Sequence, residues 1–189
     1  MENLIPAASM PDELKKRGFY LRPETPSDAD FLLTLYLSVR WPELAATHWP
    51  DASKRAFLAS QFQTQKQQYG ATYSGLERLI IEAASAPVGR LYFLSTEREI
   101  RVVDISLLPA WRNHGIGSAL LQQLGCEADS ARKPLCLQVE LHNPALRLYQ
   151  RLGFQVRDTS GPYWALERQA LAAISFHLRE APVVQHFVE

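Results

Sequence analysis

One stretch of this 189-residue chain, residues 104–121, limits its fold more than any other. Residues alternate from Ile100 to Leu108, with Ile100, Val102, Asp104, Ser106 and Leu108 on one side, which predicts a strand. Pro109 cannot donate a sheet hydrogen bond and ends it. From Ile116 the apolar positions take helical spacing, at 116, 119, 120, 124 and 128. The sequence therefore predicts a strand, a short loop and a helix in immediate succession.

The loop between this strand and this helix carries two glycines, Gly115 and Gly117. Glycines leave backbone N–H groups unshielded by Cβ atoms, the first amides of a helix have no partner within it, and the helix dipole adds positive charge. Such a loop suits a phosphate or pyrophosphate. A Walker A loop is excluded because no lysine follows Gly117, and a dinucleotide fingerprint is excluded because Leu120 replaces its third glycine.

A second pattern follows the predicted helix. Residues 135–141 alternate as a half-buried strand, and Asn143-Pro144 predicts a helix with Asn143 as N-cap and Pro144 in the first turn. Gly153 ends that helix in the left-handed conformation. Two closing strands, 154–157 and 163–167, are expected around Ser160-Gly161-Pro162. One face of the helix is formed by Ala145, Leu148, Tyr149 and Leu152.

Ahead of the central strand the sequence predicts a strand over 19–22, two helices, and strands over 79–83 and 88–94. Thr25 is the expected N-cap of the first helix, with Pro26 at its first position and Asp28 completing a capping box. Asp51 is expected to cap the second. The predicted buried faces consist of Phe31, Leu32, Leu35 and Val39 in the first helix, and of Phe57, Leu58, Gln61, Phe62 and Tyr69 in the second.

The two patterns together resemble the signatures of the GCN5-related N-acetyltransferase (GNAT) superfamily. The first is Arg-x-x-Gly-x-Gly at 112–117, and the second runs from Asn143 through Tyr149 to Gly153-Phe154. Ala145 stands one position earlier than the small residue of the family. The resemblance covers residues 18–168 and implies an α/β (α+β) fold. Its central sheet is expected to be mixed, mostly antiparallel and twisted, with splayed middle strands and flanking helices.

The resemblance also implies an activity. It implies transfer of the acetyl group of acetyl-CoA to a primary amine of a small molecule or peptide, by direct attack in a ternary complex without a metal. The alternative is a non-catalytic acyl-CoA-binding module that senses or regulates. Two interpretations are open for Lys133, Arg147 and Arg151: they contact the 3′-phosphate of the cofactor, or they are plain surface charges.

Site residues follow from the resemblance. The residues implied to bind the cofactor are Leu107 and Leu108 for pantetheine, Arg112, Asn113, His114, Gly115, Ile116, Gly117 and Ser118 for the pyrophosphate, and Asn143 and Tyr149 near the thioester. Tyr149 is the implied acid for the departing thiolate. Asp104 is the implied base, acting through a water because it is shorter than the glutamate of many relatives. Glu140 is the alternative base.

The acceptor is less constrained by the sequence. The two early helices and their connection are rich in aromatic residues and poor in acidic ones, and the aromatic set with its neighbouring histidine is Trp41, His48, Trp49, Phe57, Phe62 and Tyr69. Core packing accounts for most of such a set. Where some of them line a pocket, a flat or apolar amine is expected rather than a polycation.

Composition narrows the remaining classes. Lys+Arg and Asp+Glu are both 20, so the formal charge is zero and the usual footprint of a nucleic-acid-binding protein is lacking. No apolar run is long enough to span a membrane and the N-terminus does not read as a secretory signal, so a cytoplasmic protein is expected. Cys126 and Cys136 lack metal-ligand spacing and are interpreted as reduced thiols.

Both ends of the chain extend beyond the predicted domain. Residues 1–17 are predicted to be an irregular or short helical lead-in, and residues 169–189 a C-terminal extension with a helix over 170–178. The extension carries apolar residues, Val183, Val184, Phe187 and Val188, without local cover. Packing on the domain and packing on a second subunit of a homodimer are both open interpretations.

Overall fold

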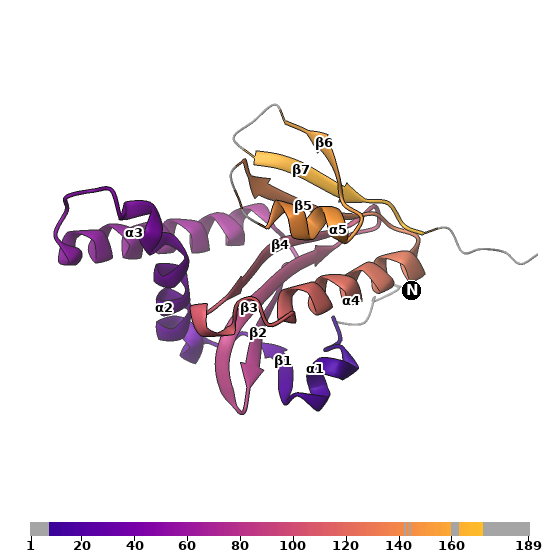
Figure 1. Cartoon of the computed structure of the whole chain (residues 1–189), viewed down its shortest axis with the longest axis horizontal. Helices are drawn as coiled ribbons and strands as arrows, with labels where there is room; N and C mark the ends of the chain where they lie inside the picture. The colour runs from indigo at the N-terminus through magenta and orange to yellow at the C-terminus, as the bar shows by residue number, and fades with distance from the viewer. Residues whose placement is uncertain (1–7, 142, 144, 160–162, 172–189) are drawn as a thin grey trace, which may run out of the picture.

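The structure is a computed structural model that describes residues 8–141, 143, 145–159 and 163–171. Within these residues a seven-stranded sheet has the order β1-β2-β3-β4-β5-β7-β6 (Figure 1). Every neighbouring pair is antiparallel except β4 and β5, which are parallel, so the predicted mixed, mostly antiparallel sheet is confirmed. The strands are β1 (Phe19–Pro23), β2 (Glu77–Ala83), β3 (Ala86–Ser95), β4 (Ile100–Leu107), β5 (Leu135–Glu140), β6 (Gln155–Asp158) and β7 (Tyr163–Arg168).

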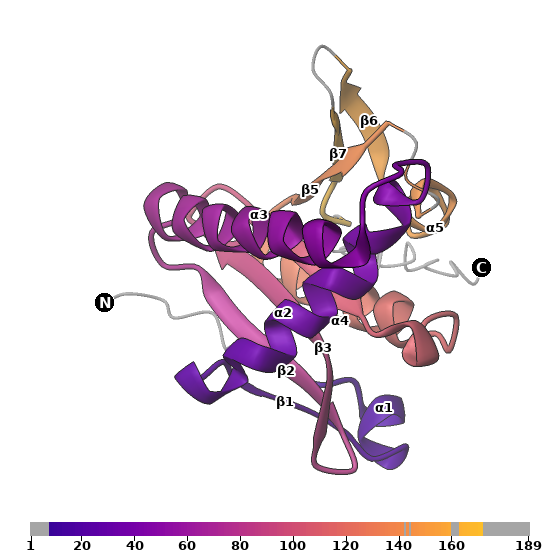
Figure 2. The same ribbon diagram turned by 90° about the vertical axis from the view of Figure 1, so that its left-hand side faces the viewer.

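Helices cover both faces of the sheet. The helices are α1 (Asp12–Lys16), α2 (Ala29–Arg40), α3 (Asp51–Thr72), α4 (Ile116–Ala131) and α5 (Leu146–Arg151), with 3₁₀ turns η1 (Pro26–Asp28), η2 (Trp41–Leu44) and η3 (Pro109–Trp111). Figure 2 shows α2 and α3 in front of the strands and α4 behind them. Accordingly the core separates into a large cluster containing Leu14 and Leu120 and a smaller one containing Leu32, Leu58 and Ile80.

The sheet opens between its two middle strands, as the splayed arrangement predicted. β4 pairs with β5 only from Ile100 to Val102, opposite Leu135 to Leu137. Beyond this point β5, β7 and β6 turn away from β1–β4 (Figures 1 and 2). Among the described residues, no strand pairs with the β5-facing side of β4 from Val103 to Leu107. This half of β4 therefore has an open edge.

The strict alternation predicted for β4 is wrong at one residue. Tyr92 pairs with Asp104 while Phe93 pairs with Val102, so Val103 is an extra residue that forms a bulge. Ile105 and Leu107 consequently pack with Ile100 and Val102 in the large core cluster. Asp104 points to the opposite face, toward α3. The bulge thereby moves a carboxylate from the apolar face to the face that carries polar side chains.

The early helices differ from prediction in detail. The chain begins its first helix at Pro26, but as the 3₁₀ turn η1, and α2 starts at Ala29. The predicted capping box is present, because the Asp28 carboxylate accepts from the Thr25 backbone N–H at 2.8 Å. Asp51 is the first residue of α3 rather than its cap, which is Pro50.

Three residues expected to be buried on these helices, Val39, Phe57 and Gln61, are exposed. Val39 is 37% exposed and Phe57 41%, because the buried stripes pass through Tyr36 on α2 and through Leu58 and Phe62 on α3. Phe57 instead packs edge-on against the exposed Trp49, with ring centroids 5.5 Å apart.

The second signature folds into the predicted strand and helix, but the helix starts late. β5 is followed by a turn in which Asn143 Oδ1 accepts from the Ala145 N–H at 2.9 Å. The α-helix α5 begins only at Leu146, because the Leu146 N–H donates a hydrogen bond to the Asn143 carbonyl three residues earlier and so closes a tight turn first. Gly153 follows the helix with φ +87°, as predicted. The positions of Pro144 and of Ser160-Gly161-Pro162 lie outside the described residues.

The chain ends are described in part. In the lead-in, α1 buries Leu14 in the same core as β1, which confirms a short helical segment there. At the other end the Leu171 N–H donates to the Asp129 carboxylate. The predicted helix over 170–178 and the apolar residues 183–188 fall outside the described residues. No helix of the described part is both long and apolar enough to cross a membrane.

Candidate active site

The glycine loop lies at the end of β4 and leads directly into α4. Asn113 and Gly115 have left-handed backbones, with φ of 63° and 77°. Residues 113–115 are exposed. The first backbone bond of the helix runs from the Ala119 N–H to the Gly115 carbonyl, so the amides of residues 116–118 have no intrahelical partner. No described side chain caps this N-terminus. These free amides are the groups that the predicted anion site requires.

Side chains hold the loop from behind. Arg112 donates from Nε to the Leu107 carbonyl at 2.9 Å and from Nη2 to Ser38 on α2. Arg17 donates from both Nη atoms to the His114 carbonyl at 3.2 Å. Arg112, which the resemblance implied for the pyrophosphate, thus uses its guanidinium in this structure to hold the loop to β4 and α2.

Packing alone does not explain the glycine at position 117. A Cβ atom built on Gly117 meets only the Ile105 Cδ1 atom, at 3.9 Å, which is an ordinary van der Waals contact. Position 117 therefore has room for a side chain, yet the sequence has a glycine there. A glycine with free space above exposed amides fits a site where a ligand approaches the backbone closely.

The open edge of β4 supplies fewer free groups than predicted. The Leu108 N–H donates to the Val88 carbonyl on β3, so it is used within the sheet. Backbone groups alternate in direction along a strand, so the Leu107 N–H and carbonyl face away from β3. That carbonyl already accepts from Arg112. The Leu107 N–H is the group left to pair with an extended ligand at this end of the strand.

Tyr149 lies on α5 beside the opening between β4 and β5. Its side chain is 9% exposed and its ring packs edge-on against Phe154, with centroids 5.9 Å apart. Burial raises the pKa of the Tyr149 phenol above its ordinary value, and the nearby Asp104 carboxylate raises it further. The phenol is therefore protonated at neutral pH. Asn143 stands before the same helix and uses its side-chain oxygen for the turn.

Asp104 is held in a buried network rather than facing solvent. Its Oδ2 accepts from Arg90 Nη2 at 2.6 Å and from the Tyr69 hydroxyl at 3.4 Å, and its Oδ1 accepts from the Ser106 hydroxyl at 2.6 Å. The side chains of Arg90 and Asp104 are 5% and 12% exposed. Both carboxylate oxygens are thus engaged in this structure.

Glu140, the alternative base, lies at the end of β5 and is also paired. Its Oε1 accepts from Arg40 Nη1 at 2.8 Å, and Arg40 further pairs with Glu43. The Glu140 side chain is 48% exposed. The ion pair joins the end of α2 to the end of β5 across the opened part of the sheet.

The other residues weighed from the sequence are scattered. Lys133 donates to the Thr96 carbonyl at 2.6 Å and so holds a turn, whereas Arg147 and Arg151 are exposed on α5. The aromatic residues do not form one pocket. Phe62 and Tyr69 line a cleft on the α3 face, while Trp41 lies under Arg55 and Trp49 pairs with Phe57 at the surface.

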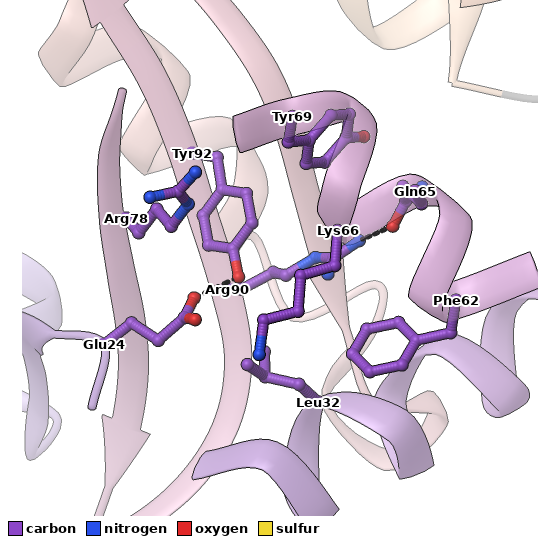
Figure 3. Close-up of a pocket in the computed structure, with 9 residues that line it drawn as sticks. All are labelled: Glu24, Leu32, Phe62, Gln65, Lys66, Tyr69, Arg78, Arg90 and Tyr92. Carbon is purple, nitrogen blue, oxygen red and sulfur yellow. Dashed lines mark hydrogen bonds between the residues drawn. The ribbon is translucent and has the colours of Figure 1, made fainter. Parts of the chain in front are cut away.

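Sequence reasoning missed the charged residues of that cleft. Figure 3 shows it between α3 and strands β2 and β3, lined by Glu24, Leu32, Phe62, Gln65, Lys66, Tyr69, Arg78, Arg90 and Tyr92. One signal was available in the sequence. Arg90 is a single cation inside the otherwise uncharged run of residues 86–95, and a charge within a buried strand requires a partner.

The described part of the chain contains two free thiols and no cluster of metal-ligating side chains. No group of three or more His, Cys, Asp or Glu side chains there is arranged to hold a metal ion. Burial raises the pKa of the Cys136 thiol to about 12. Cys126 is exposed and, like Cys136, is a free thiol.

Comparisons with known proteins agree with this geometry. Residues 76–156 match the family described as acetyltransferase (GNAT) domain. No curated protein sequence matches the chain.

Solved structures share the fold at low sequence identity. PaiA N-acetyltransferase from Thermoplasma acidophilum, in complex with coenzyme A, is 18% identical and has a TM-score of 0.60, covering 80% of this chain and 98% of its own. An acetyltransferase from Thermus thermophilus is 22% identical, with a TM-score of 0.58 and coverage of 80% and 96%. Naa50 from Arabidopsis thaliana, in complex with the bisubstrate analogue CoA-Ac-MVNAL, is 14% identical, with a TM-score of 0.52 and coverage of 80% and 99%.

Proposed function

Because residues 76–156 match an acetyltransferase (GNAT) domain and solved acetyltransferases share the fold, we propose that this chain is an N-acetyltransferase that moves the acetyl group of acetyl-CoA to a primary amine of an acceptor. The proposal rests on one arrangement. The N-terminus of α4 has no side-chain cap, and it follows β4, whose edge β5 leaves open. We place the activity in the cytoplasm, where thiols such as Cys126 and Cys136 stay reduced.

The chain's own groups suit the two ends of the cofactor. The amides from Asn113 to Ser118 would hold the pyrophosphate, because residues 113–115 are exposed, the amides of residues 116–118 lack intrahelical partners, and the segment lies at the positive end of the helix dipole. The Leu107 N–H would pair with the pantetheine arm as with an added strand. Arg112 supports both parts by joining the loop to the Leu107 carbonyl.

In direct transfer no side chain of the protein forms a covalent bond with the acetyl group. Bound acetyl-CoA supplies a thioester, and the acceptor nitrogen forms a bond to its carbonyl carbon as the carbon–sulfur bond breaks. Holding amine and thioester in line is the main contribution. Tyr149 would donate its proton to the leaving sulfur, and the raised pKa of its phenol keeps that proton available. The proton lost by the amine would pass through a water to Asp104, the carboxylate that lies near the Tyr149 phenol.

One observation favours a second candidate function. Asp104 and Glu140 already bond arginine side chains, so neither carboxylate is free to take a proton from an amine without rearrangement. A module that binds acyl-CoA and senses or regulates would need no base. The two candidates differ in one outcome, whether a primary amine is consumed.

The test is release of coenzyme A from acetyl-CoA that depends on added primary amine. The thiol assay should use a Cys126→Ser background, because the exposed Cys126 thiol would react with the reagent. Tyr149→Phe should lower kcat about 100-fold, in the range for a lost general acid, with a much smaller effect on acetyl-CoA affinity. Phe keeps the ring that packs on Phe154. Tyr20→Phe is the matched control, since Tyr20 is 57% exposed on β1. Binding of acetyl-CoA without transfer to any amine would instead support the sensor.

A further inference from the structure

The cleft beside α3 is built differently from the glycine loop, because side chains rather than backbone line it. Of its charged residues Arg90 is buried, Glu24 and Arg78 are half-buried and Lys66 is exposed. It lies on the α2–α3 face of the sheet (Figure 3). Arg90 connects it to Asp104 through their 2.6 Å ion pair. Phe62 and Leu32 form its apolar wall. The cleft therefore adjoins the proposed base without containing it.

Positive charge exceeds negative charge around this cleft. The side chains of Lys66 and Arg78 line it and form no ion pair or hydrogen bond with any residue that the structure describes. The one carboxylate in the lining, Glu24, accepts a hydrogen bond from the Tyr92 hydroxyl. Asp104, the other carboxylate nearby, is matched by Arg90. Two cations, Lys66 and Arg78, thus remain beside a single carboxylate.

Arg90 is incompletely satisfied within this lining. The residue is 4% exposed, its Nη2 donates to Asp104 and to Gln65, and its guanidinium lies 4.9 Å from the centre of the Tyr92 ring. Its Nε is buried and has no hydrogen-bond partner among the described residues. Buried donors are nearly always paired in folded proteins, so an unpaired one in a cleft lining indicates a missing acceptor.

We propose that this cleft binds a carboxylate of the acceptor, so that the substrate is a primary amine that also bears a carboxylate. This inference rests on the proposed function and deepens it. Lys66 and Arg78 supply the attracting charge, and Arg78 can bind a carboxylate through two parallel N–H groups. Phe62 and Leu32 contact the carbon chain between the two ends. The amine then lies on the Asp104 side of Arg90, and a polycation is repelled.

The experiment compares matched acceptors under the amine-dependent assay. β-Alanine, γ-aminobutyrate and ε-aminocaproate are each paired with the corresponding amide, which keeps the amine and removes the negative charge. The carboxylates should have a kcat/KM at least tenfold above their amides. In Lys66→Ala and in Arg78→Ala this preference should fall about tenfold, mainly through KM. Lys54→Ala is the matched control on α3, because Lys54 does not line the cleft, and it should keep the wild-type preference.

Three outcomes would overturn the inference. Equal use of amides and carboxylates would remove the need for a carboxylate site while leaving the N-acetyltransferase proposal intact. A preference that survives both cleft variants would place the site elsewhere, provided that thermal unfolding shows the variants to be folded. No transfer to any amine, with acetyl-CoA bound, would overturn the proposed function and this inference with it.

Discussion

The glycine loop on the α4 side of the sheet and the polar network on the α2–α3 side are built from different groups. The loop offers backbone amides at the uncapped start of a helix, and its neighbouring core is apolar. The network consists of paired charges that come from distant parts of the chain, Arg90 with Asp104 and Arg22 with Asp28 and Glu82. A change in the loop is therefore expected to affect binding, whereas a change in the network is expected to affect folding as well.

This difference has a physical origin. Backbone amides at a helix start are present whatever side chains surround them, so the loop needs only local sequence to form. A buried charge is stable only when its partner is in place, so the network depends on the register of β3 against β4 and on the bulge at Val103. Substitutions in the two regions should therefore differ in their effects on stability and on binding, and the largest effect is expected in the network.

Asp104→Ala should cause the largest loss of stability. It leaves the Arg90 guanidinium buried without its carboxylate, and removing one partner of a buried pair costs about 3–5 kcal/mol. Urea unfolding would measure this loss. The double variant Asp104→Leu with Arg90→Met should recover most of it, because both charges are then absent. A loss below about 1 kcal/mol in the single variant would contradict the buried-pair description.

Asp28→Asn should have a smaller effect that depends on pH. The hydrogen bond from Arg22 lowers the pKa of the Asp28 carboxyl below its ordinary value, and bonds from Thr25 add to this. The carboxylate therefore stabilises the fold above about pH 4, and the contribution is lost as the pH falls through the lowered pKa. At pH 7 the variant should lose about 2 kcal/mol, from a charge-assisted bond and a helix cap.

The gap in unfolding free energy between wild type and Asp28→Asn should narrow below about pH 4. Asp12→Asn serves as the control, because Asp12 pairs with Lys15 at the surface and its loss should leave stability unchanged. A gap that stays constant from neutral to acid pH would show that Asp28 acts by packing rather than by charge.

Glu140→Gln should have the smallest effect. The Arg40–Glu140 pair is partly exposed, with 29% and 48% of the side chains accessible, so its loss should cost less than about 1 kcal/mol. The kcat of Glu140→Gln should differ less than twofold from wild type in the amine-dependent assay if Asp104 receives the proton of the amine. A 100-fold fall in kcat with unchanged stability would identify Glu140 as the base and would remove Asp104 from that role.

Sequence alone predicted the glycine-loop side of the sheet better than the α2–α3 side. The strand, glycine loop and α4 follow one another within residues 100–131, so local spacing and two glycines were sufficient. The position of Asp104 could not be predicted in this way. Strict alternation placed it with Val102, whereas the bulge at Val103 turns it toward Arg90 on β3.

The cleft illustrates the same limit. Glu24, Lys66, Arg78 and Arg90 come from a loop, a helix and two strands, and no spacing in the sequence connects them. The aromatic residues of the early helices were the visible feature, yet Trp49 and Phe57 pack together at the surface. Hydrophobicity identified helices α2 and α3 and most of their buried residues, including Leu35 and Leu58, but it wrongly placed Val39 and Phe57 among them.

Thermal unfolding with and without acetyl-CoA tests the central claim most directly. With ligand at about 100 times its dissociation constant, linkage predicts about 2.7 kcal/mol of stabilisation. For a domain of this size that is a rise in Tm of about 5–10 °C. Gly117→Val should fold, because a Cβ there makes only an ordinary contact, and it should lose most of the shift. No shift in the wild type, or an equal shift in Gly117→Val, would contradict a cofactor site built on the amides of this loop.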